Sequence, residues 1–240
     1  MNRNTSLPLA KKPETPRRLT QRAHRIAIGL LGFLLPTLSY LLAGVRLTTG
    51  LEPWQVLGSV SEYYYTGGVG VFVGILFAMA LFLFTYPGYE GFIWDRVLGV
   101  AGGIAGACIA LFPTRIPDGL TPLPWWHPCT GIIHYTSAVV LFGVFATFSL
   151  WLFRRSNIPV RAQRPPDKQR RDRACLICGI VILLGMGWAG FEAWQDRSMV
   201  IPESIAIMAF CVSWLVKGEV VTAGADALRE LRAEMAGSGE

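Results

Sequence analysis

Long runs of apolar residues dominate the chain and are separated by shorter polar connections. A helix needs about 20 mostly apolar residues to cross roughly 30 Å of hydrocarbon. Six runs reach or approach this length, and together they contain no Lys, Arg or Asp, one Glu (Glu203) and one His (His134). The pattern predicts an all-α fold, a polytopic membrane helix bundle with six transmembrane helices. The predicted helices cover residues 26–45, 68–86, 97–112, 131–153, 174–191 and 200–216.

Three regions follow from this pattern. Residues 1–25 contain three prolines and many basic side chains, and they are predicted to form a flexible basic tail. Residues 26–216 make up the six-helix transmembrane domain. Residues 217–240 form a second tail, in which Val221, Leu228, Leu231 and Met235 recur at a spacing that favours a short amphipathic helix.

The composition fits a membrane protein. Hydrophobic residues make up 52% of the 240 residues and charged residues 16%, whereas soluble domains carry about 25% charged residues. This balance excludes a disordered chain, a coiled coil and a disulfide-rich secreted module, and it argues against a soluble enzyme.

The formal net charge of +6 is unevenly distributed along the chain. Of the 22 Lys and Arg residues, all but Arg46, Arg115 and Arg197 lie in the two tails and in the second and fourth connections. Short cytoplasmic loops retain positive charge during insertion. We therefore expect both termini in the cytoplasm and the chain in the plasma (inner) membrane. The basic connection 154–173 is expected to contact anionic lipid headgroups and not nucleic acid.

Glycines at four-residue spacing predict where helices pack closely. Gly99, Gly102, Gly103 and Gly106 form two overlapping pairs, which mark the run 97–112 as a tightly packed central helix. The preceding run contains one similar pair, formed by Gly70 and Gly74.

Polar residues that suit a binding site gather at the predicted outer ends of the helices. Ionisable groups at this depth are costly and are often functional. His127, Thr130, His134 and Ser137 follow one another at spacings that place them on one helix face. Acidic side chains of other helices are expected at the same level, as partners for His134. The candidate site residues are Ser61, Glu62, Tyr64, Thr114, His127, His134, Ser137, Glu192 and Glu203.

Several candidates also have a purely structural interpretation. Glu203 follows Pro202 in a first helical turn, where the helix dipole favours a carboxylate. Glu62 and the three tyrosines that follow it suit an anchor at the membrane interface. His134 suits an interior histidine that is hydrogen-bonded to a neighbour.

Five short motifs resemble, in their order and spacing, those of a family of six-helix bacterial integral membrane proteins with no assigned function. They are SEYYYT at 61–66, VFVG at 71–74, ALFPT at 110–114, HYTSA at 134–138 and AFCVSWLVKGE at 209–219. The resemblance implies six membrane spans and brings no activity, substrate or catalytic residue. Members often carry an Arg-Asp pair before the second motif, where this chain has Val69 and Gly70.

Three functions fit these observations. The first is binding of a small amphiphile or lipid in an outward-facing polar cavity. The second is a metal-dependent intramembrane hydrolase, in which Glu62, His134 and Glu203 bind a metal or activate water. The third is a proton-coupled transporter that uses a membrane-embedded Glu and His as a relay. The sequence leaves the ligand, any cofactor or metal, and the oligomeric state open.

Overall fold

A computed structural model describes residues 16–43, 56–89, 91–117, 123–156, 158 and 160–219 of the chain. Within these ranges the fold is all-helical, as predicted, and contains no strand. The α-helices are α1 Pro16–Leu42, α2 Val69–Phe84, α3 Ile93–Leu111, α4 Pro128–Leu150, α5 Pro166–Trp194 and α6 Val200–Lys217. Short 3₁₀ helices lie between them: η2 Val60–Tyr65, η3 Leu152–Arg154 and η4 Arg161–Gln163.

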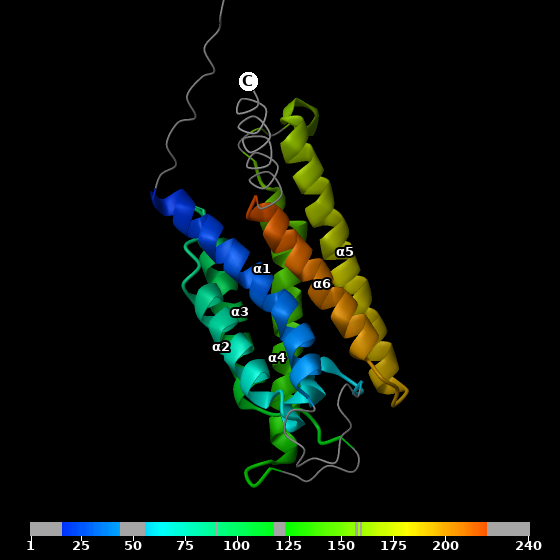
Figure 1. Cartoon of the computed structure of the whole chain (residues 1–240). Helices are drawn as coiled ribbons and strands as arrows, with labels where there is room; N and C mark the ends of the chain where they lie inside the picture. The colour runs from blue at the N-terminus through cyan, green and yellow to red at the C-terminus, as the bar shows by residue number, and fades with distance from the viewer. Residues whose placement is uncertain are drawn as a thin grey trace, which may run out of the picture.

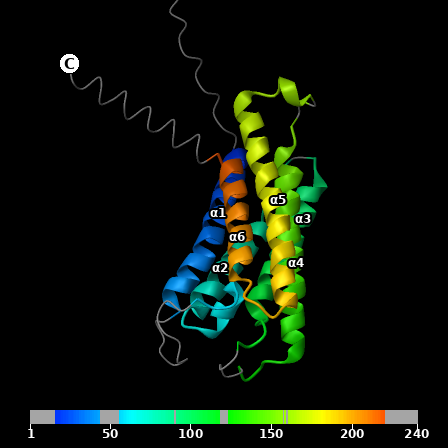
Figure 2. The ribbon, with the colours of Figure 1, turned by 90° about the vertical axis from the view of Figure 1, so that its right-hand side faces the viewer.

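The six α-helices form a closed ring in which neighbours run in opposite directions (Figure 1). Each helix packs against the next one in the chain, and α6 closes the ring by packing against α1. Figure 2 shows α1 and α6 side by side, with α5 and α4 next to them around the bundle. As a result, α1 begins and α6 ends at the same end of the molecule. We call this the basic end, and we call the opposite one the η2 end.

Five of the helices are long and apolar enough to cross a membrane. The sixth, α2, is equally apolar but has 16 residues, about 24 Å at 1.5 Å per residue, which is less than the roughly 30 Å of a hydrocarbon core. It is short because the chain first forms η2, which packs against α1, α2 and α6. The N–H of Gly67 then donates to the carbonyl of Ala43, just after α1, at 3.1 Å.

Two predicted boundaries move toward the basic end. The helix α1 begins at Pro16, so residues 16–25, predicted as part of the flexible tail, are its first turns. The helix α5 begins at Pro166, inside the predicted connection 154–173. A proline suits the first helical position because its missing N–H is not needed there. The predicted amphipathic helix, which is based on Val221, Leu228, Leu231 and Met235, and the tail 1–15 lie outside the described residues.

The glycines of α3 confirm one predicted helix contact, and those of α2 correct another. A Cβ added to Gly99 or Gly103 would come within 2.7 and 2.9 Å of carbonyl oxygens of α2, so the two backbones touch there. A Cβ added to Gly70 or Gly74 would meet nothing within 4 Å. The predicted packing role of the second pair is therefore wrong, because no described helix lies against that face of α2.

An aromatic cluster fills the bundle near the basic end. Trp214 of α6 is fully buried. The rings of Tyr86, Phe148 and Phe153 lie 5.5, 5.1 and 5.0 Å from its indole, measured between centroids. Tilted and edge-to-face rings at these distances add to the stability that comes from burial.

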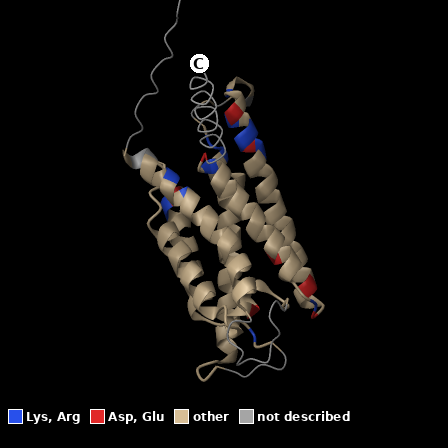
Figure 3. Cartoon of the chain, in the orientation of Figure 1, with Lys and Arg blue, Asp and Glu red and all other residues tan. Residues whose placement is uncertain are grey.

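Charged residues gather at the two ends of the bundle (Figure 3). Lys and Arg are concentrated at the basic end, on the first turns of α5 and around the start of α1 and the end of α6. The middle parts of the helices lack charge, as expected for segments that can lie in hydrocarbon.

Candidate functional site

Two predicted acidic residues, Glu62 and Glu203, meet at the loop that leads into η2. A carboxylate oxygen of Glu203 accepts the backbone N–H of Val60 at 2.8 Å, and one of Glu62 accepts that of Gly58 at 2.8 Å. The carbonyl of Gly58 in turn accepts the N–H of Met199 at 2.7 Å, just before α6. The two side chains therefore fasten η2 to the start of α6, since each satisfies a backbone donor that would otherwise have no partner in this turn.

The three tyrosines of η2 are buried, which corrects their interpretation as interfacial anchors. Tyr64 is 8% exposed and packs against Phe72. The hydroxyl of Tyr65 donates to the carbonyl of Thr114 at 2.7 Å. Burial raises the pKa of Tyr65 to about 12. The candidates Tyr64 and Thr114 thus belong to the packing that holds η2, and Thr114 contributes its backbone carbonyl.

The polar face of α4 points inward, as its spacing predicts. Thr130 and His134 are buried and Ser137 is half-buried. His127 is exposed, and it caps the helix by accepting the N–H of Cys129 on Nδ1 at 3.2 Å. Of the four residues of the predicted stripe, Thr130, His134 and Ser137 therefore face the bundle and His127 does not.

The expected carboxylate partner of His134 is replaced by a backbone carbonyl. Nδ1 of His134 is hydrogen-bonded to the carbonyl of Phe112 at 2.7 Å. Nε2 is buried and has no hydrogen-bond partner among the described residues. This arrangement corresponds to the structural alternative, an interior histidine bonded to its neighbour, because the end of α3 reaches the imidazole before any acidic side chain does.

The structure does not assemble the predicted metal site. In the part of the chain that is described, no three His, Cys, Asp or Glu side chains lie close enough to hold a metal ion. Glu192 is engaged elsewhere: it accepts the indole N–H of Trp188 at 2.7 Å and pairs with Arg197 at 2.6 Å. These contacts tie the end of α5 to the turn that precedes α6.

A wide cavity of about 640 Å³ opens at the η2 end, and we call it the polar mouth. Arg115 faces Asp196 across it at 4.0 Å, with 77% and 90% of their side chains exposed. Charges of both signs are therefore present in similar number. The mouth is lined by Glu62, Arg115, Ile116, Pro117, Tyr135, Ala193, Asp196, Arg197 and Met199.

A second space of about 170 Å³, the apolar groove, runs between α4, α5 and α6. Tyr135, Ala193 and Met199 border both the groove and the mouth, so the two spaces meet there. Glu203 is the one carboxylate among the described residues that line the groove. The other lining residues are Ala138, Val139, Phe142, Gly185, Met186, Ala189, Gly190 and Ala206.

Glu203 also borders a small interior cavity. This cavity has about 50 Å³ and lies among apolar side chains of α1, α2, α3, α4 and α6, with Ser61 at its η2 end. The candidates Ser61, Glu62 and Glu203 thus lie next to accessible space, and His127, His134, Ser137 and Glu192 line none of these three cavities.

Sequence reasoning missed the residues that shape the mouth and the groove. Arg115 and Arg197 were used only to assign the orientation in the membrane. Because Lys and Arg are rare in the connections of the η2 end, these two residues could have been predicted as site residues. Gly185, Ala189 and Ala193 recur at four-residue spacing on α5, the same small-residue pattern that was noted in α3. On α5, Gly185 is in tight contact with α6, where an added Cβ would lie 3.1 Å from the carbonyl oxygen of Pro202, and all three residues border the groove.

Comparison with known protein families, curated proteins and solved structures yields no match for this chain. Its class is therefore defined by its own architecture. It is an all-helical bundle whose apolar helices fit a multi-pass membrane protein in contact with membrane lipids. The similarity to the six-helix bacterial family stays a prediction.

Proposed function

We propose that this multi-pass protein binds a single-chain amphiphile, with the polar headgroup in the polar mouth and the chain in the apolar groove. One observation carries the proposal: a space lined by charged side chains and an apolar one share Tyr135, Ala193 and Met199 as a common border. An amphiphile has the same division between a polar and an apolar part. This is the first of the three functions that the sequence suggested.

The headgroup decides the selectivity of such a site. When the acyl chain of an amphiphile enters the groove, it exchanges contacts with lipid tails for contacts with a helix surface of similar polarity. This exchange gains little from the hydrophobic effect. The small residues Gly185, Ala189 and Ala193 let the chain lie close to the helix backbone. In the mouth, Arg115 and Arg197 face acidic side chains, and this near balance favours a zwitterionic or uncharged polar headgroup over a purely anionic one.

The distribution of Lys and Arg supports an orientation with the basic end in the cytoplasm and the mouth facing outward from the plasma membrane. The chain offers a direct test, because Cys129 near the η2 end is exposed and the other four cysteines are buried or half-buried. A membrane-impermeant maleimide should label intact cells that express the protein, and the Cys129→Ser variant should lose this label. Labelling that requires permeabilised cells would reverse the orientation.

Filling the groove tests the binding proposal. Gly190 lines the groove and Gly187 does not, and both are exposed positions of α5 where an added Cβ meets nothing within 4 Å. We expect Gly190→Leu to weaken binding of a fluorescent lysophosphatidylcholine about tenfold or more, because the leucine side chain occupies part of the groove and removes packing contacts of the chain with the helices.

The matched control is Gly187→Leu, which adds the same side chain to the same helix. It should leave the affinity within about twofold of the wild type when protein in nanodiscs is titrated with the labelled lipid. Equal affinities of the two variants would contradict the proposed location of the chain.

A further inference from the structure

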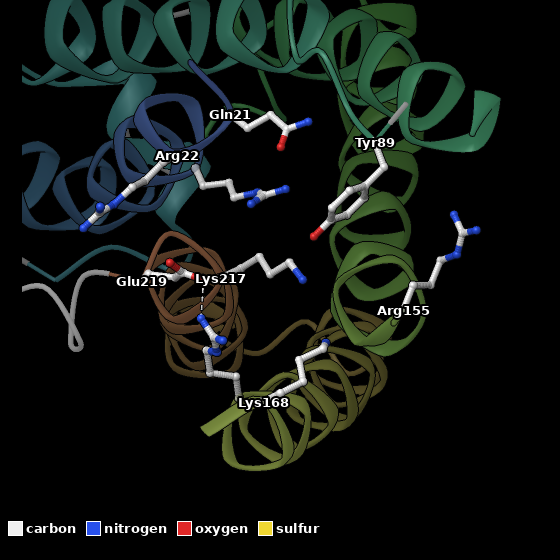
Figure 4. A pocket seen from close by; sticks show the side chains of 9 residues that line it. Gln21, Arg22, Tyr89, Arg155, Lys168, Lys217 and Glu219 are labelled. Carbon is white, nitrogen blue, oxygen red and sulfur yellow. Dashed lines mark hydrogen bonds and ion pairs between the residues drawn. The ribbon is translucent and has the colours of Figure 1, made fainter. Parts of the chain in front are cut away.

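A pocket at the basic end gathers basic side chains from four parts of the chain. It has a volume of about 200 Å³ and lies between α1, the connection from α2 to α3, and the facing ends of α5 and α6. Figure 4 shows the side chains of Lys168 and Lys217 pointing into the same space, with the ring of Tyr89 opposite. The basic lining residues are Arg22, Arg25, Arg155, Lys168, Arg171 and Lys217.

Carboxylates neutralise only part of this charge. Asp95 lies nearby but accepts the N–H of Tyr89 at 3.1 Å and does not line the pocket. The ion pairs of this region are Glu219 with Arg171, and Asp172 with Lys168 and Arg164. Within the described ranges, no ion pair involves Arg22, Arg25 or Lys217.

These three cations are held in place by neutral acceptors. Arg22 donates from Nε to the carbonyl of Gly218 at 3.2 Å, and Lys217 donates to that of Phe153 at 2.7 Å. The ammonium of Lys217 also lies 5.3 Å from the centroid of the Tyr89 ring. The positive groups are thus fixed in position without a direct ion pair among the described residues, an arrangement that suits a preformed anion site.

Arg25 points most directly to a missing ligand. Its side chain is 7% exposed, and its Nε donates to the hydroxyl of Tyr86 at 2.9 Å. Its Nη2 is buried and has no hydrogen-bond partner among the residues that the structure describes. A buried guanidinium with an unpaired donor is costly, and an oxyanion in the pocket that Arg25 lines would supply the missing acceptor.

We propose that this pocket binds a phosphate group, carried either by an anionic phospholipid headgroup or by a small soluble phosphate. A guanidinium fork matches the geometry of phosphate oxygens, and a lysine ammonium adds a compact point charge. The pocket lies at the end of apolar helices, the level at which lipid headgroups meet basic side chains. The inference is independent of the amphiphile site at the η2 end.

The two sources of phosphate are distinguished by two measurements on the full-length protein. In detergent, inorganic phosphate is titrated while the thermal unfolding midpoint is followed. In mixed phosphatidylglycerol and phosphatidylcholine, native mass spectrometry counts the lipids retained. A saturable rise of the midpoint identifies soluble phosphate, and selective retention of phosphatidylglycerol identifies the lipid headgroup.

Arg25→Gln should weaken the binding of phosphate or phosphatidylglycerol, whichever of the two is observed, about tenfold or more. Arg173→Gln removes the same charge from an exposed position of α5 outside the pocket and should change it less than twofold. If Arg25→Gln does not fold, the half-buried Arg22→Gln takes its place against the same control. Absence of selective binding in both measurements, or equal losses in pocket and control variants, would overturn the proposal.

Discussion

The two ends of the bundle use the same types of charged residue in opposite ways. In the polar mouth, Arg115 and Asp196 face each other with most of their side chains in solvent. At the basic end, Asp172 is 2% exposed between Arg164 and Lys168, and Arg25 is buried and forms no ion pair with any residue that the structure describes. The mouth therefore has balanced, loosely held charges, and the basic pocket has fixed cations, of which Arg22, Arg25 and Lys217 form no ion pair within the described ranges.

This difference indicates what each end can recognise. Exposed ion pairs contribute little free energy and rearrange easily around a polar headgroup. Buried cations have already lost their water, so an anion that reaches them gains more than it would at the surface. Overall charge along the chain does not reveal this distinction; the burial and pairing of each cation do.

The largest predicted effect compares the two aspartates directly. Asp172→Asn should lower the free energy of unfolding by about 3 kcal/mol or more, because it leaves two partly buried cations without their partner. Asp196→Asn should change it by less than about 1 kcal/mol, since the pair with Arg115 is exposed. Denaturant unfolding of the purified variants in one detergent measures both values.

Asp196 is a fair control because its φ of 51° lies in the left-handed region, which asparagine tolerates as well as aspartate. Similar losses for the two variants would show that the ends do not differ in the way their ion pairs are buried.

A smaller effect concerns one buried tyrosine at each end. Burial raises the pKa of Tyr65 at the η2 end and of Tyr86 at the basic end to about 12, against an ordinary value of 10.0. Below pH 10 both phenols are protonated in the folded and the unfolded protein. Between about pH 10 and pH 12 the unfolded chain loses these protons first, so stability should fall by on the order of 2 kcal/mol for the fully buried Tyr86 and by less for Tyr65.

Tyr65→Phe and Tyr86→Phe should each reduce this alkaline loss of stability, measured as the free energy of unfolding at pH 9 and at pH 11.5. Tyr86→Phe should also weaken phosphate binding at neutral pH, because the phenol orients Arg25. An alkaline loss that persists unchanged in both variants would contradict the burial of these hydroxyls.

The smallest effect tests how η2 is fastened. Glu203→Ala leaves the N–H of Val60 without its acceptor and should cost about 1 to 2 kcal/mol of unfolding free energy. Ser204→Ala at the next position of α6 should cost less than about 0.5 kcal/mol. A cost for Glu203→Ala no larger than that of its neighbour would mean that this carboxylate does not hold the loop.

The helices were predictable because hydrocarbon imposes their length and composition. Each predicted run coincides with one α-helix, and the contact of Gly99 and Gly103 followed from their spacing. The starts of α1 and α5 were not predictable from hydropathy, because a helix that satisfies its own backbone continues through basic residues whose long side chains reach water. Gly70 and Gly74 of α2 face no helix among the described residues, which periodicity cannot reveal.

The sites were predictable only where they depend on local sequence. The inward face of Thr130 and His134 followed from helical spacing, whereas the carbonyl that pairs with His134 comes from the end of another helix. The basic pocket combines Arg25, Tyr89 and Lys217, which are far apart in the sequence and adjacent only because α6 closes the ring on α1. No local pattern encodes such a meeting.

The most direct test of the two-site account is a binding experiment in which both ligands are titrated against the same two variants. Gly190→Leu should weaken binding of the labelled lysophosphatidylcholine and leave phosphate binding unchanged, and Arg25→Gln should have the opposite effects. If each variant weakens both ligands to the same extent, the two ends do not act as separate, chemically distinct sites, and the central claim is contradicted.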